Sequence, residues 1–103
     1  MNNIVLIGMP GSGKSTIGVI LAKRLGYDFV DTDNLISDRE KTTLQDIIDK
    51  KGVSEFLKIE GIVGKELNID NTVIATGGSM VFSDSAMKNL LKDSKCVFID
   101  VPL

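Results

Sequence analysis

One short loop near the N-terminus combines glycine turns, a lysine and hydroxyl groups. Residues 8–15 read GMPGSGKS, which matches the pattern G-x-x-x-x-G-K-[ST] without a mismatch. In such a loop the backbone amides close around phosphate oxygens, and the following helix adds the positive end of its dipole. Lys14 would reach the β- and γ-phosphates of ATP, and the Ser15 hydroxyl would help to hold Mg²⁺. The predicted nucleotide-binding residues are Gly8, Pro10, Gly11, Ser12, Gly13, Lys14, Ser15 and Thr16.

Two carboxylates, Asp31 and Asp33, follow a short apolar segment further along the chain. They point to the same side if the extended geometry continues past the strand. Near a phosphate loop, one of them could hold Mg²⁺ or its waters, and the other could accept the proton of an attacking hydroxyl. Alternatively, Asp33 caps the next helix and Asp31 is a solvated turn residue, and Asp33 could also perform both roles. Beside the phosphate loop, the pattern favours the functional interpretation.

Two weaker patterns come later in the chain. Gly77 and Gly78 form a tight turn whose backbone amides could bind a substrate oxygen, although most such pairs are only turns. Asp100 closes the apolar run 96–99, as the acid of a Walker B strand does next to Mg²⁺. An ordinary aspartate at the end of a strand explains Asp100 equally well.

Short apolar runs that alternate with longer amphipathic segments must position these groups. The predicted strands are residues 3–8, 27–31, 72–75 and 96–101, and the predicted helices are residues 14–25, 33–41, 43–51, 54–67 and 84–92. This alternation predicts an α/β fold with a parallel sheet. Together with the phosphate loop after the first strand, it leads us to expect a P-loop NTPase-type domain of three layers whose four strands have the order 2-3-1-4. Because ligands bind outside the carboxyl ends of parallel strands, the phosphate loop, the aspartate pair and the glycine turn should meet in one site.

The apolar spacing also predicts how individual helices pack. Four residues at helical spacing should form the inner face of the first helix: Ile17, Ile20, Leu21 and Leu25. Ser54 should cap the fourth helix. Gly61 and Gly64 lie inside that helix, where each costs about 1 kcal/mol relative to alanine, which indicates close packing of the helix backbone.

The composition indicates a folded domain without a basic surface. The 103 residues are 43% hydrophobic and 25% charged, with a net charge of −2, so residues 1–103 are expected to form one domain. This balance gives no support for nucleic-acid or membrane partners, and the N-terminus lacks the pattern of a signal peptide. The single cysteine, Cys96, excludes a disulfide framework and favours a buried thiol in a cytoplasmic protein. With no histidine in the sequence, acid–base chemistry would fall to carboxylates.

With these motifs in place, the chain resembles the shikimate kinases. These are small P-loop kinases that transfer the γ-phosphate of ATP to a hydroxyl of shikimate, in aromatic amino-acid biosynthesis. The similarity runs in order through residues 8–16, 29–33, 52–60 and 76–78. The phosphate loop is shared by many NTPases, whereas the aspartate pair and the glycine turn at these separations are more specific to this family.

The resemblance implies roles for individual residues. Asp31 would lie near Mg²⁺, together with Ser15. Asp33 would contact substrate hydroxyls and serve as the base, so that Lys14 and Asp33 are the expected catalytic residues. The acceptor pocket would be lined by Asp33, Gly77, Gly78 and Ser79.

Three departures from the family pattern affect the acceptor side. The family usually has an arginine that clamps the substrate carboxylate where this chain has Leu57, while Glu60, which supports that arginine in the family, is kept. The family turn has three glycines, whereas here the third is Ser79. The family also continues past the position of Leu103 with an arginine-bearing lid, a fifth strand and a final helix. We therefore expect a fragment of a longer kinase that is monomeric when whole, with a fourth strand that could associate at its open edge. The alternative is a functional oligomer that covers this edge.

Three functions are consistent with this pattern. The first is ATP-dependent phosphorylation of shikimate. The second is a related kinase for a different small alcohol, since leucine at position 57 predicts a less anionic acceptor. The third is a nucleotide-binding module without transferase activity.

Overall fold

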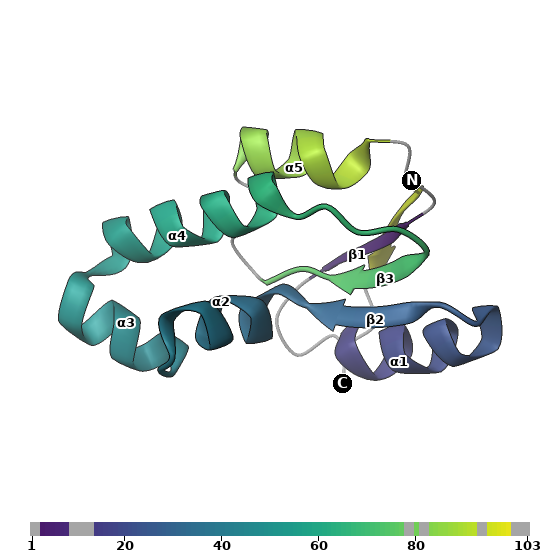
Figure 1. Ribbon diagram of the computed structural model, residues 1–103, viewed down its shortest axis with the longest axis horizontal. Coiled ribbons are helices and arrows are strands. Elements are labelled where there is room, and N and C mark those ends of the chain that lie inside the picture. The colour runs from purple at the N-terminus through teal and green to yellow at the C-terminus, as the bar shows by residue number, and fades with distance from the viewer. Residues whose placement is uncertain (1–2, 9–13, 78–79, 81–82, 93–94, 100–103) are drawn as a thin grey trace.

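The computed structural model describes residues 3–8, 14–77, 80, 83–92 and 95–99 of the chain. The strands of this part form one parallel sheet: β1 (Ile4–Gly8), β2 (Asp28–Asp31), β3 (Thr72–Ala75) and β4 (Lys95–Ile99). Their order is β2-β3-β1-β4 (Figure 1), so the predicted order 2-3-1-4 is confirmed. β1 and β3 read IVLIG and TVIA, and such unbroken apolar runs suit strands that are covered on both faces.

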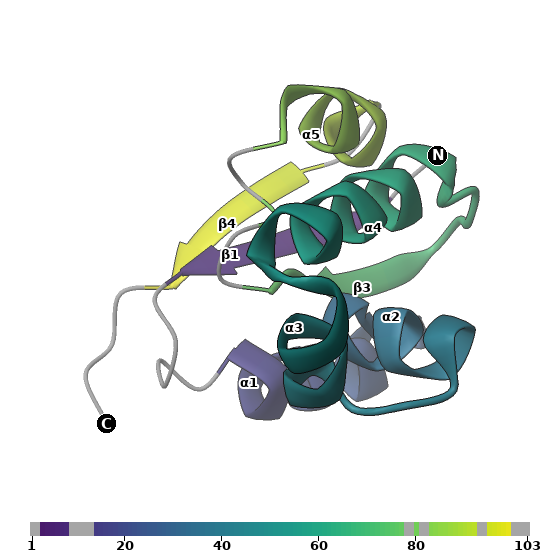
Figure 2. The ribbon, with the colours of Figure 1, turned by 90° about the vertical axis from the view of Figure 1, so that its left-hand side faces the viewer.

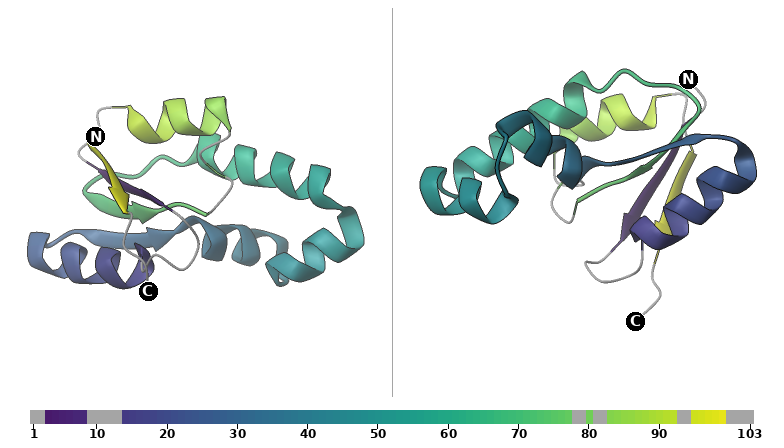
Figure 3. Two further views of the ribbon diagram at one scale, coloured as in Figure 1. Left: turned by 180° about the vertical axis from the view of Figure 1, so that it is seen from behind. Right: turned by 60° about the horizontal axis from the view of Figure 1, so that its bottom comes forward.

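Helices cover both faces of the sheet. α1 (Lys14–Leu25) lies on one face, while α4 (Val53–Glu66) and α5 (Asp84–Leu91) lie on the other (Figures 1 and 2). α2 (Thr32–Glu40) and α3 (Leu44–Lys51) connect β2 to α4 at one end of the molecule. Seen from behind, the blue-purple α1 and the yellow-green α5 again lie on opposite sides of the strands (Figure 3). This layering agrees with the predicted three layers, and no helix of the described residues is long and apolar enough to cross a membrane.

Two apolar clusters lie on opposite faces of the sheet because successive strand residues point to opposite sides. Leu6 and Val73 face α1, where they pack with Ala22. Their neighbours Val5 and Ile74 face the other way and pack with three buried residues of the segment that follows β3: Met80, Ala86 and Leu90. The alternation therefore fixes which side of each strand meets which helix.

A third cluster lies away from the sheet and joins α2, α3 and α4. Its buried members are Ile36, Ile47, Phe56, Ile59 and Val63. Phe56, Ile59 and Val63 recur at the three- and four-residue spacing of one face of α4. The cluster holds α2 and α3 against α4, so the three helices form an arm beside the sheet (Figure 1).

The predicted inner face of α1 is only half right. Ile17 and Leu21 pack toward the sheet, but Ile20 is 53% exposed and Leu25 is 46% exposed. The centre of the buried face is occupied by Gly18 and Ala22 instead, and a Cβ at Gly18 would collide with the ring of Phe29. Small residues at this contact let the helix lie close to the strands, which an apolar count alone does not show.

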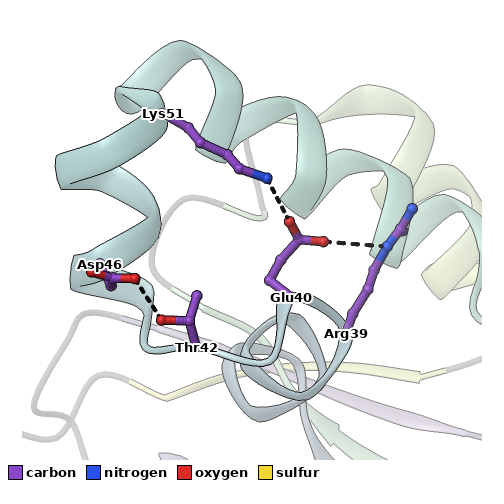
Figure 4. A network of polar contacts seen from close by, with 5 residues as sticks. All are labelled: Arg39, Glu40, Thr42, Asp46 and Lys51. Carbon is purple, nitrogen blue, oxygen red and sulfur yellow. Dashed lines mark hydrogen bonds and ion pairs between the residues drawn. The ribbon is translucent and has the colours of Figure 1, made fainter.

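The turn between α2 and α3 is held by polar contacts at the surface. Lys41 ends α2 in the left-handed conformation with φ 57°, and Thr43 caps α3 by accepting a bond from the Asp46 amide. Glu40 pairs with Lys51 at 3.1 Å and with Arg39 at 3.7 Å (Figure 4). The Thr42 hydroxyl donates to Asp46 at 2.6 Å in the same network.

The predicted cap of α4 is wrong, while the predicted close packing of α4 is confirmed. The helix begins at Val53 with Gly52, not Ser54, as its N-cap. Gly52 has φ 85°; its amide ends α3 by bonding the Ile48 carbonyl, and its own carbonyl accepts the Phe56 amide. A Cβ at Gly64 would lie 2.5 Å from the Ala86 Cβ and 2.7 Å from the Met80 Sδ, so α4 and α5 approach closely there.

Other predicted bounds agree with the structure to within one residue, apart from those of the fourth strand. That strand begins one residue earlier than predicted, at Lys95, and the last two residues predicted for it lie outside the described part of the chain.

Candidate active site

The carboxyl ends of three adjacent strands bring the predicted motifs to one edge of the sheet. In the register of the sheet, Ala75 of β3 pairs with Leu6 of β1 on one side and with Asp31 of β2 on the other. β1 leads into the phosphate loop, β2 ends at Asp31, and the turn after β3 begins directly past Ala75. The predicted convergence at the carboxyl ends is therefore present in the described part of each motif.

Asp31 connects two of these strand ends. Its Oδ2 accepts a hydrogen bond from the Ser15 hydroxyl in the first turn of α1, at 2.7 Å. Its Oδ1 accepts a bond from the Asp33 amide at 2.9 Å, which caps α2. The alternative that Asp33 is the cap is therefore wrong, and Asp31 is a half-buried residue at the end of a strand, not a solvated turn residue. One carboxylate joins the helix that follows the phosphate loop to the residue expected to act as base.

Ser15 and Asp31 also provide the oxygen donors that a magnesium site needs. Ser15 and Asp31 place a hydroxyl and a carboxylate oxygen 2.7 Å apart at the start of α1, and both are hard oxygen donors of the kind that Mg²⁺ prefers. In the described residues no group of three or more acidic or cysteine side chains gathers that could hold a metal ion by itself. Such a pair suits a metal that takes its remaining ligands from phosphate and water.

Asp33 and Glu60 both lie against Gly77 in the turn that follows β3. A Cβ placed on Gly77 would run into the Asp33 Oδ1 and would lie 3.4 Å from the Glu60 Oε2. Asp33 is half-buried, whereas Glu60 is only 2% exposed. A side chain at position 77 would therefore have to displace the Asp33 carboxylate, whereas Glu60 lies at ordinary contact distance.

The Gly77 amide is bonded inside the protein. It donates to the Thr32 Oγ1 at 2.8 Å, and Gly77 itself is buried. The expectation that this amide is exposed for a substrate oxygen is therefore wrong for Gly77. The physical reason is that Thr32, the first residue of α2, places its hydroxyl next to the turn, where it already accepts this amide.

The same turn is also bound to β1. Both the amide and the hydroxyl of Thr76 donate to the Leu6 carbonyl, at 3.1 Å and 2.9 Å. Thr32 and Thr76 were not singled out by the sequence patterns, because each bond joins residues that are far apart in the chain. The sequence did contain one indication, because a threonine directly follows each of the strands β2 and β3. At the end of a strand, a threonine hydroxyl can form the hydrogen bond that a backbone group would otherwise make.

Leu57 and Glu60 lie three residues apart on α4, the separation at which helix side chains are neighbours. Leu57 is 45% exposed and apolar, although the buried carboxylate of Glu60 lies next to the acceptor turn. Lys58 is exposed as well. The helix thus presents a leucine, not a fixed cation, beside this part of the site.

Several predicted site residues lie outside the described part of the chain, and their roles stay predictions. These are Pro10, Gly11, Ser12, Gly13, Gly78, Ser79 and Asp100. Lys14 begins α1 and Thr16 lies exposed in its first turn, as the predicted loop requires.

Comparisons with known proteins point to one family. A protein-family model described as "Shikimate kinase" matches residues 10–103. A shikimate kinase of Clostridium botulinum (strain Eklund 17B / Type B) is 43% identical over 103 residues, which cover 99% of this chain and 62% of that protein. One of Persephonella marina is 38% identical over 104 residues, which cover 100% of this chain and 63% of that protein.

Solved structures show the same similarity. The crystal structure of shikimate kinase from Aquifex aeolicus superimposes with a TM-score of 0.87 at 38% identity, covering 98% of this chain and 61% of that one. The shikimate kinase from Acinetobacter baumannii in complex with shikimate gives a TM-score of 0.90 at 34% identity, covering 97% and 56%. The chain therefore spans about 60% of the length of these relatives.

Proposed function

This chain belongs to the shikimate kinase family, and on that premise we propose that the protein transfers the γ-phosphate of ATP to a hydroxyl of shikimate. The observation that carries the proposal is the pair of bonds at Asp31, which join Ser15 on the phosphate side to Asp33 on the acceptor side. A phosphotransferase needs such a fixed relation, because its two substrates must meet in line. The synthesis of aromatic amino acids and a cytoplasmic location belong to the same proposal.

The donor half would hold ATP with the loop residues and Lys14. The backbone amides from Gly8 to Gly13 would surround the phosphates, and Lys14 would balance their charge. Ser15 and Asp31 would hold Mg²⁺, which supplies neutralisation of the phosphate charge when it is bound. The 2.7 Å contact between Ser15 and Asp31 supports this assignment.

The acceptor half would use Asp33 as the proton acceptor. The acceptor oxygen forms a bond to the γ-phosphorus, the bond from that phosphorus to the β–γ bridging oxygen breaks, and the hydroxyl proton passes to the Asp33 carboxylate. Gly77, Gly78 and Ser79 would line the space for the acceptor. The support for this placement is the direct contact of Asp33 with the Gly77 backbone position.

The test is shikimate-dependent ADP release by the whole protein. We expect release with shikimate, and a fall of about 10²- to 10⁴-fold in Asp33→Asn, the usual range for loss of a general base. Asp38→Asn, an exposed aspartate further along α2, is the matched control and should leave the rate unchanged. Absence of shikimate-dependent ADP release in the wild-type protein would exclude this function.

A second candidate is a kinase of the same type for a small alcohol without a carboxylate. The observation that favours it is the exposed Leu57 beside the buried Glu60, since leucine cannot form a bidentate pair with a carboxylate. A panel of acceptors with and without a carboxylate separates the two candidates. The second candidate would be favoured if the wild-type protein prefers neutral polyols and the Leu57→Arg variant prefers shikimate.

A nucleotide-binding module without transferase activity is the remaining possibility. It predicts ATP or ADP binding that Lys14→Ala weakens, with no phosphorylated product for any acceptor. Reproducible turnover of one acceptor is sufficient to eliminate it.

A further inference from the structure

Thr32 lies between the two aspartates and is completely buried. Its exposed fraction is 0%, and it is the first residue of α2. Its Oγ1 accepts the Gly77 amide at 2.8 Å, although the two residues are 45 positions apart in the chain. The side chain therefore joins the start of the helix that carries Asp33 to the turn that follows β3.

This bond matters because the turn and the carboxylate of Asp33 are in direct contact. The Asp33 Oδ1 occupies the space where a side chain on Gly77 would begin. A displacement of the turn therefore changes the position available to the carboxylate, and the reverse is also true. The amide of Gly77 is buried, and an amide in such a place needs its hydrogen-bond acceptor.

Thr76 lies in the same turn, and the loss of its hydroxyl should disturb the turn less than the loss of the Thr32 hydroxyl. It is also buried, at 3% exposed, and its hydroxyl also bonds across the sheet, to the Leu6 carbonyl. The Thr76 amide donates to the same carbonyl, so the loss of the hydroxyl leaves one bond in place. At Thr32 the hydroxyl itself is the partner of the Gly77 amide, and an apolar replacement removes that acceptor.

We propose that Thr32 is a positioning residue, whose hydroxyl fixes the Gly77 turn against Asp33 and thereby sets the acceptor side of the site. The inference rests on the proposed phosphotransferase function. It assigns no chemical step to Thr32, which acts through Gly77 and Asp33. The nucleotide side is reached through Ser15 and Asp31, so it should be largely independent of this bond.

The experiment compares three variants in the whole protein: Thr32→Val, Thr32→Ser and Thr76→Val. Valine keeps the shape of threonine and removes the hydroxyl, while serine keeps the hydroxyl. We expect Thr32→Val to raise the KM for shikimate about tenfold, which corresponds to the loss of one hydrogen bond at a buried site. The dissociation constant for ADP should stay within about twofold, because its binding residues are untouched. Thr32→Ser should restore the KM, and Thr76→Val should change it by less than about threefold.

Amide exchange gives a second readout that needs no turnover. The Gly77 amide should exchange faster in Thr32→Val than in the wild type, Thr32→Ser or Thr76→Val. Equal effects of Thr32→Val and Thr76→Val on both the KM and the Gly77 exchange would overturn the inference. A wild-type protein without shikimate-dependent turnover overturns the proposed function instead, and the exchange of Gly77 then still decides whether Thr32 holds the turn. If Thr32→Val does not fold, failure of Thr32→Ser to retain wild-type KM and exchange overturns the inference.

Discussion

Asp31 and Thr43 perform the same local task in two regions of the molecule, and they differ in what else depends on them. Asp31 caps α2 at the site edge, which we define as the carboxyl ends of β1, β2 and β3 with Asp31, Thr32 and Gly77. Thr43 caps α3 in the outer arm, which we define as residues 39–51, the end of α2, the turn after it and α3. Asp31 also accepts the Ser15 hydroxyl from another helix, whereas the Thr43 cap bonds Asp46 within its own helix. A cap at the site edge thus links separate elements, while a cap in the arm stabilises the helix that it starts.

The comparison predicts that changes at the site edge lower activity, whether or not they also lower stability, whereas changes in the outer arm affect stability alone. The types of residue are similar in both places, because each contains an aspartate and at least one threonine: Asp31 and Thr32 at the site edge, and Asp46, Thr42 and Thr43 in the outer arm. The differences in effect should therefore come from burial and from contacts between elements.

The largest effect is expected for Gly77→Ala. The new methyl group would meet the Asp33 carboxylate, so either the turn or Asp33 must move. We expect about 100-fold slower transfer, as for a misplaced catalytic group, together with about 1–3 kcal/mol of lost stability from overpacking. Steady-state kinetics and urea unfolding measure the two quantities.

Gly26→Ala is the matched control for this change. Gly26 has φ 70° with open space around its Cβ position, so alanine is strained there but collides with nothing. Its stability should fall by about 1 kcal/mol, with unchanged transfer. A loss of transfer in Gly26→Ala as large as in Gly77→Ala would remove the distinction between a local collision and general instability.

Asp31→Asn should have the next largest effect. Asparagine keeps an oxygen that can cap α2, so the stability should stay within about 1 kcal/mol of wild type. It removes the negative charge beside Ser15, and we expect transfer to fall on the order of 10- to 100-fold, as for other residues that support a metal or a catalytic group. Measuring the rate over a series of Mg²⁺ concentrations checks whether the loss is relieved by more metal.

Thr43→Ala is the corresponding change in the outer arm. The loss of its cap should lower the free energy of unfolding by about 1 kcal/mol without affecting transfer. If Thr43→Ala slows transfer as much as Asp31→Asn does, the two caps are equivalent and the comparison is wrong.

Glu40→Gln should have a small effect. It removes the charge that pairs with Lys51 and Arg39 at the surface of the arm (Figure 4). Exposed pairs contribute about 0.2–1 kcal/mol, and salt screens them, so the difference from wild type should shrink at high ionic strength. Urea unfolding at two salt concentrations measures it, and a difference that grows with salt would contradict the electrostatic explanation.

Asp46 should give the smallest effect, visible as a dependence on pH. The Thr42 hydroxyl that donates to it, followed by Lys50, lowers the pKa of the Asp46 carboxyl below its ordinary value. A carboxyl with a lowered pKa in the folded state stabilises the fold above its unfolded pKa, and that contribution is lost as the pH falls through the folded pKa. Asp46→Asn should therefore lose a little stability at neutral pH and lie closer to wild type in acid. Unfolding midpoints of both proteins, measured from neutral to acid pH, would show this difference. A difference in stability that grows in acid would refute the lowered pKa of Asp46.

Much of the fold could be predicted because it depends on local patterns. The run TVIA predicts β3 with its observed bounds, and the phosphate loop pattern predicts the start of α1 at Lys14. These features need no knowledge of distant contacts.

Two of the failures arise from contacts between distant segments, and one arises from the exact residue at which a helix begins. Ile20 fits the apolar spacing of α1, but Gly18 and Ala22 make the closest contact with the sheet. The cap of α2 is Asp31 and not Asp33, because the strand ends one residue before the helix begins. The bond between Thr32 and Gly77 could not be predicted from the glycine pair itself, since its partner lies 45 residues earlier.

The most direct test of the account is identification of the product. The whole protein is incubated with shikimate, Mg²⁺ and ATP labelled at the γ-phosphate, and the products are resolved by mass. The account predicts labelled shikimate carrying one added phosphate, formed in step with ADP, and formed about 10²- to 10⁴-fold more slowly in Asp33→Asn. ADP formed without labelled shikimate, or labelled shikimate formed equally by Asp33→Asn, would contradict it.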